Sequence, residues 1–128
     1  MTIATPGART GALEAIERIL NREGEADVIL RAAVATLAER LGPRWAAIAF
    51  VEDGAMVPGP VAGDPPAEPT RPSVAAPVEY RHSLVAEIWL DSDGQPDADD
   101  QAFLRRIADL LSPYCLVGWD TGGEEWDV

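Results

Sequence analysis

The chain of 128 residues contains no lysine, a single cysteine (Cys115) and a single histidine (His82). One thiol cannot form an internal disulfide, a Cys-x-x-Cys redox pair or a thiolate zinc cage. Any chemistry that needs cysteine and histidine together must therefore use this one pair. We expect Cys115 to be a small buried hydrophobe, because it falls at core spacing in a predicted helix, and His82 to be solvated in a turn.

The ten cations are all arginines, and 22 acidic residues outnumber them, which gives a formal net charge of −12. This balance argues against nucleic acid and anionic membranes as partners, because both bind cationic surfaces. No apolar run approaches the ~20 residues that a membrane span requires, and no secretory signal is visible at the first residues. The sequence therefore predicts a cytoplasmic protein with one globular domain.

Two helices are predicted in the first third of the chain. Residues 1–10 lack periodicity and are expected to form a flexible lead-in, followed by a helix over residues 11–22 with one apolar stripe. A second helix is predicted from an N-cap at Asp27 to Gly42, because glycine followed by proline ends a helix.

The next segments are predicted to form strands. Residues 45–52 (WAAIAFVE) are apolar on both alternate faces, which is typical of a strand covered on two sides. Asp53-Gly54 is a hairpin turn signal, and residues 55–61 form a second strand that its prolines make irregular and edge-like. The proline-rich segment 63–72 is expected to be a crossover loop.

Residues 74–90 predict a β-hairpin whose register follows from the apolar pattern. A shift by one residue would turn Glu79 and Glu87 toward the apolar face, which is costly. The opposite face is mixed, with two carboxylates and Trp89. It is either partly exposed or lines a pocket for a cationic or amine-bearing ligand. The predicted register pairs Tyr80 with Leu84, Val78 with Ala86, Ala76 with Ile88 and Val74 with Leu90.

The acidic loop 91–100 is predicted to cap a last helix, with Asp97 or Asp99 as N-cap, because carboxylates suit the positive end of a helix. Its glycine and acidic positions do not match a calcium-binding loop, so no metal site is predicted. Residues 118–128 form an acidic tail, and its Asp-Thr-Gly triplet lacks the second aspartate that an aspartic protease requires.

The order of these elements resembles that of a GAF domain over residues 11–117. The segments that carry the resemblance are ADVILRAAVATLAERLG, WAAIAFVEDG, Ala76-Pro77-Val78, VAEIWLDS and FLRRIADLL. It implies an α+β, GAF-like (profilin-like) fold: an antiparallel sheet with N- and C-terminal helices packed on one face and a shortened crossover on the other.

GAF domains that bind ligands do so on the crossover side of the sheet. The resemblance therefore implies that this side is the candidate ligand-binding site. The candidate residues are Glu79, Glu87, Trp89, Asp91 and Phe50.

Three features resemble the free methionine-(R)-sulfoxide reductases within this family: Trp45 at the start of the first strand, Gly59-Pro60 with Gly63 after the first hairpin, and Leu90-Asp91-Ser92 at the end of the last strand. Those enzymes act through cysteines in the crossover, which has none here, and Cys115 belongs to another element. Asp91 matches one of their substrate-binding carboxylates, whereas Trp89 and Ser73 stand where acids would be expected. No catalytic residues are therefore predicted.

We expect a non-catalytic GAF-like sensory, small-molecule-binding or protein-interaction domain without a cofactor, acting as a homodimer through its terminal helices. Two alternatives stay open. One is a diverged enzyme related to the sulfoxide reductases, and the other is a structural interaction module with a filled pocket.

Overall fold

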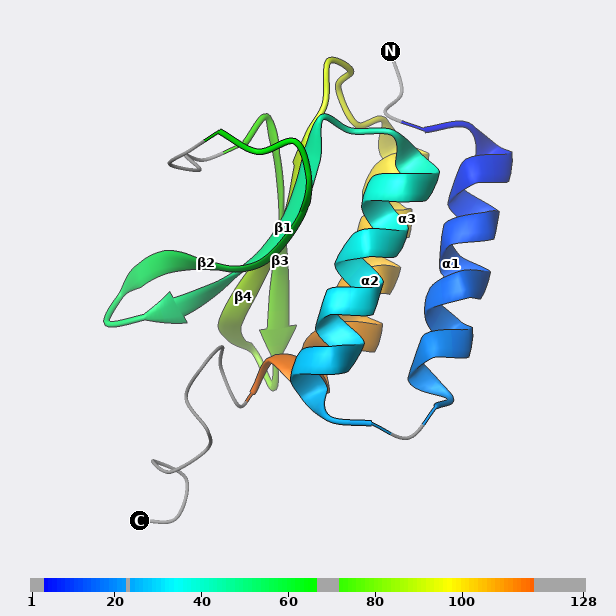
Figure 1. Cartoon of the computed structure of the whole chain (residues 1–128). Coiled ribbons are helices and arrows are strands. Elements are labelled where there is room, and N and C mark those ends of the chain that lie inside the picture. The colour runs from blue at the N-terminus through cyan, green and yellow to red at the C-terminus, as the bar shows by residue number, and fades with distance from the viewer. Residues whose placement is uncertain (1–3, 23, 67–71, 117–128) are drawn as a thin grey trace.

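The computed structural model describes residues 4–22, 24–66 and 72–116, which form helices and strands in the predicted order (Figure 1). The predicted acidic tail 118–128 and residues 67–71 of the predicted crossover lie outside the described residues. The elements are α1 (Pro6–Leu20), α2 (Ala26–Leu41), β1 (Trp45–Glu52), β2 (Ala55–Gly63), β3 (Val74–Tyr80), β4 (Ser83–Asp91), α3 (Ala98–Leu111) and the 3-10 turn η1 (Ser112–Cys115).

The four strands form one antiparallel sheet in the order β2-β1-β4-β3, and the helices lie on one side of it (Figure 1). Helix α2 packs against β1 and β2, α3 packs mainly against β3, and α1 packs on α2 and α3. The predicted α+β, GAF-like arrangement is therefore confirmed.

The main core fills the space between the sheet and the helices. Its members alternate along each strand, since every second side chain of a strand points to the same face. The largest fully buried apolar side chains there are Phe50, Ile16, Leu30, Leu37, Ile48, Ile88, Leu90, Ile107, Leu111, Val34 and Val78.

The first two helices begin earlier than predicted. The hydroxyl of Thr5 accepts a hydrogen bond from the Ala8 amide (3.1 Å), and Pro6 takes the first helical position, where its missing N–H costs nothing. Helix α2 begins after Glu25, so Asp27 lies in its first turn instead of capping it. The predicted stop at Gly42 is confirmed, since this residue adopts the left-handed conformation (φ 72°).

Helix α3 has the predicted N-cap at Asp97. The Asp97 carboxylate accepts a hydrogen bond from the Asp100 amide (2.8 Å), and the Asp100 carboxylate accepts one from the Asp97 amide (3.1 Å). Asp100 is fully buried and also bonds the guanidinium of Arg9 (2.7 Å). This ion pair ties the start of α1 to the start of α3.

The β1–β2 hairpin agrees with the sequence. Strand β1 has the predicted bounds, the Asp53-Gly54 turn joins the strands, and β2 lies at the sheet edge as expected. The pairing shifts between Ala47 and Ala49, which is the irregularity that prolines predict. Strand β2 ends two residues later than predicted, at Gly63.

The β3–β4 register is confirmed for three of the four predicted pairs, and the pair nearest the turn is wrong. Tyr80 pairs with Ser83, because Arg81 and His82 form a two-residue turn with positive φ at both positions (52° and 69°). The pairing shifts between Val78 and Glu79, which sets Leu84 opposite Glu79. Leu84 is therefore 44% exposed and does not join the core.

Candidate functional site

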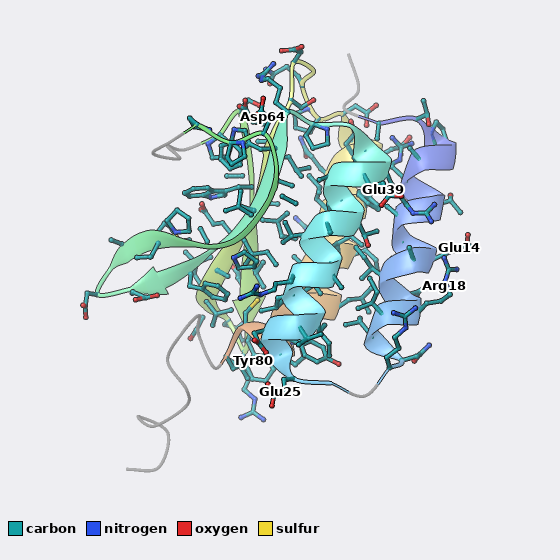
Figure 2. All side chains as sticks on the ribbon, in the orientation of Figure 1. Glu14, Arg18, Glu25, Glu39, Asp64 and Tyr80 are labelled. Atoms are coloured by element: carbon teal, nitrogen blue, oxygen red, sulfur yellow. The ribbon has the colours of Figure 1, made fainter. Side chains whose placement is uncertain are left out.

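The sheet face opposite the helices carries a second, smaller hydrophobic cluster, which we call the distal cluster. Side chains stand on both faces of the sheet in Figure 2. The strand pairing explains the membership of the cluster: Ala47 lies opposite Trp89, and Ala49 lies opposite Glu87. Its members are Trp45, Ala47, Ala49 and Trp89, with Met56 and Ala75 packed against them.

Two indole rings dominate the distal cluster. Trp45 and Trp89 are each 4% exposed, and their ring centroids lie 6.2 Å apart at an interplanar angle of 71°. Such an edge-to-face contact is a favoured arrangement for aromatic pairs. The two residues come from neighbouring strands, so the contact fixes both rings on the same sheet face.

The carboxylate of Glu87 lies beside this pair. It is 9% exposed and accepts a hydrogen bond from the indole Nε1–H of Trp89 (2.9 Å). Burial of a carboxylate is costly unless hydrogen bonds compensate it. The arrangement therefore places a largely buried carboxylate at the Nε1 edge of the Trp89 ring.

Glu79, the other candidate carboxylate of this hairpin, differs from Glu87 in exposure. Glu79 is exposed and lies beyond the register shift of the hairpin, opposite Leu84, whereas Glu87 lies opposite Pro77.

Asp91 lies at the end of β4 and is held by an arginine. Its carboxylate accepts a hydrogen bond from Nε of Arg44 (2.8 Å), and Asp93 bonds the same guanidinium. The hydrogen bond from the Arg44 guanidinium holds the pKa of Asp91 below its ordinary value. The Ser73 amide also donates a hydrogen bond to the Asp91 carboxylate, which acts in the same direction. Asp91 thus has a structural partner that joins the start of β1 to the end of β4.

Phe50 does not belong to the candidate site. It is 1% exposed and lies in the main core, on the helix side of the sheet. Positions 45, 47 and 49 of β1 face the distal side, so the next residue necessarily faces the helices. The prediction omitted Trp45, which does lie on the distal face. Odd-numbered positions of β1 share a face with Glu87 and Trp89, so the pairing of β1 with β4 would have identified it.

Cys115 is buried, as predicted, with 3% exposure. Burial raises the pKa of its thiol to about 12. Because the thiolate is the nucleophilic form of cysteine, the thiol is unreactive at neutral pH. Among the described residues, no group of three or more His, Cys, Asp or Glu side chains is placed to hold a metal ion.

Two surface hollows lie elsewhere. One of about 370 Å³ separates the outer edge of β3 from α3, and one of about 330 Å³ lies between α2 and β2. Neither is lined by the predicted site residues. Within the described parts of the chain, no helix has the length and apolarity needed to cross a membrane.

An antiparallel sheet with its N- and C-terminal helices on one face is the architecture of the GAF-like fold, and the comparison with solved structures supports this assignment. The chain matches the free methionine-R-sulfoxide reductase of Neisseria meningitidis in complex with its substrate with a TM-score of 0.70 and 17% identity. That match covers 90% of this chain and 93% of the reductase.

Two further structures have the same fold. The GAF domain of an Acinetobacter phosphoenolpyruvate-protein phosphotransferase matches with a TM-score of 0.63 and 13% identity, over 80% of this chain and 91% of that domain. The Staphylococcus aureus reductase, also in complex with its substrate, matches with 0.65 and 16%, over 88% and 98%. No family model matches the sequence, and no curated protein does. The chain thus has a GAF-like fold.

Proposed function

We propose that this GAF-like domain is a non-catalytic module that binds a small molecule with a protonated amine on the distal face of its sheet. The observation that carries the proposal is the Glu87 carboxylate, 9% exposed and hydrogen-bonded to Trp89, whose ring packs against that of Trp45. A carboxylate attracts an ammonium group directly, and the face of an indole attracts it through its quadrupole. The two together favour a cationic ligand.

The structural neighbours support this class of ligand. Two of them are reductases of free methionine-R-sulfoxide with substrate bound, and a free amino acid carries an ammonium group at neutral pH. In those two reductases, the same fold therefore binds an amine-bearing small molecule. The proposal does not include sulfoxide reduction, because Cys115 is the single cysteine of this chain and burial raises the pKa of its thiol to about 12.

Ligand binding is tested by thermal unfolding of the full chain with amino acids and amines, each paired with the analogue that lacks the amine. Binding to the folded state at 100 times Kd stabilises it by about 2.7 kcal/mol. We expect Glu87→Gln to abolish most of this stabilisation, because the amide keeps an acceptor for Trp89 but loses the charge. The matched control is Glu79→Gln, which removes an exposed carboxylate from the same hairpin and should leave the shift intact.

Stabilisation by the deaminated analogues as well, or equal loss in both variants, would contradict the role of Glu87.

The second candidate function is an interaction module with a filled pocket, which the low exposure of Trp45 and Trp89 favours. This candidate predicts that none of the amines changes the unfolding temperature.

A homodimer through the terminal helices is a further part of the proposal. The apolar side of α1 packs on α2 and α3 of the same chain, with Ala12, Ala15 and Ile16 buried, so a dimer would use the remaining outer surfaces. Light scattering should give twice the chain mass of 13.7 kDa at micromolar concentration. A mass of one chain up to the millimolar range would refute the dimer.

A further inference from the structure

The hollow between β3 and α3 is a groove of about 370 Å³ along an open edge of the sheet. Strand β3 is the last strand in the order β2-β1-β4-β3, and no described strand pairs with its outer edge. The lining residues are Ser73, Val74, Ala75, Ala76 and Pro77 of β3 and its lead-in, Gln95 and Pro96 of the loop, and Gln101, Leu104 and Arg105 of α3.

An edge strand offers alternate N–H and C=O groups that an extended segment can pair with. Here α3 supplies a second wall, on which Gln101 and Arg105 are exposed, whereas Leu104, at 3% exposure, belongs to the main core. The groove therefore has the two parts that strand addition requires, namely a backbone ladder and a side-chain wall. Pro77 has no N–H and therefore removes one donor, at the end of the groove that is nearest Tyr80.

The charge of the groove selects an acidic occupant. Arg105 is the one charged residue among those that line it, in a chain whose net charge is −12. An anionic side chain placed there would meet a cation, whereas most of the surface would repel it.

The chain itself contains a segment of this kind. Residues 117–128 (VGWDTGGEEWDV) contain four acidic residues and no cation. They follow η1, which contacts β3 and β4 and lies at the Tyr80 end of the sheet (Figures 1 and 2). Twelve extended residues span about 40 Å, and the seven residues of β3 about 23 Å, so this segment can reach the far end of the groove.

We propose that residues 117–128 of the same chain add to the outer edge of β3 as an antiparallel strand and fill the groove. A segment that runs back from η1 meets Arg105 before Leu104, because α3 runs toward η1. In the sequence Glu124-Glu-Trp126, the first and third residues share one face of a strand. This order sets Glu124 against Arg105 and places Trp126 on the same face, two residues further along the groove.

Hydrogen exchange of the full-length chain tests the proposal. In the wild-type chain, the amides of residues 117–128, and those of residues 73–76 that point away from β4, should exchange at least about tenfold more slowly than in an unstructured peptide. Arg105→Glu should bring residues 117–128 to the unstructured rate. The control is Arg106→Glu, which reverses the next charge of α3 but affects only the surface ion pair with Glu17 (3.7 Å) and should leave both segments protected.

The charge swap Arg105→Glu with Glu124→Arg should restore protection to within about twofold of the wild type, since it rebuilds the pair in reverse. The proposal is overturned if residues 117–128 of the wild-type chain exchange at the unstructured rate, or if both arginine variants behave alike. Protection that disappears on dilution from about 100 μM to about 1 μM would assign the segment to a second copy, which also overturns it.

Discussion

The two faces of the sheet differ in chemistry although they come from the same four strands. The helix side is apolar throughout and is covered by α2 and α3. The distal side combines two tryptophans and small alanines with the Glu87 carboxylate. Only the helix side needs its side chains for the packing of the helices.

The largest expected difference between the faces is in stability. Phe50→Ala should lower the free energy of unfolding by about 3–5 kcal/mol, because it opens a cavity in the main core. Val51→Ala, at the next position of β1 and 38% exposed on the distal side, should change it by less than about 1 kcal/mol. Urea unfolding of both variants measures the difference, and similar costs would mean that the distal side also carries the fold.

This contrast also explains what could be predicted from the sequence. The alternation in residues 74–90 defines two faces, because carboxylates on the wrong face would be costly. Strand β1 gives no such cue, since WAAIAFVE is apolar at both parities, and Phe50 was therefore assigned to the wrong face. Only the pairing of Ala49 with Glu87 resolves the parity.

Two other differences have local causes. The turn at Arg81-His82 requires positive φ at both positions, which these residues rarely adopt, so the sequence favours a longer turn and the wrong last pair. The early start of α1 could have been predicted, since Thr5-Pro6 is a capping residue followed by proline at the first helical position. The overall fold depends on neither detail.

The second prediction concerns the contacts within the distal face. Trp89→Phe keeps an aromatic ring but removes the indole N–H that donates to the Glu87 carboxylate, and the loss of a hydrogen bond to a charged group costs about 1.5–3 kcal/mol. Trp45→Phe, at an equally buried ring, should cost less because it does not remove that donor. Thermal unfolding of both variants compares them. Equal losses would mean that ring size, and not the hydrogen bond to Glu87, governs this face.

The smallest expected effect lies at the end of the sheet, where Arg44 and Asp91 form an exposed ion pair. Because the folded state holds the pKa of Asp91 below the value of about 3.9 in the unfolded chain, the pair stabilises the fold above that pH. This contribution is lost as the pH falls through the lower pKa of the folded state. Arg44→Gln should therefore reduce the loss of stability that urea unfolding measures as the pH falls below about 4.

The Arg44–Asp91 pair also tests whether Asp91 belongs to the proposed binding site. If Asp91 serves the sheet end and not the ligand, Asp91→Asn should weaken the acid dependence as Arg44→Gln does, while the stabilisation by an amine stays unchanged. Loss of that stabilisation in Asp91→Asn, but not in Arg44→Gln, would extend the binding site to the end of β4. In that case the amine of the ligand would take the place of Arg44 on the Asp91 carboxylate, and Asp91 would serve both the ion pair and the ligand.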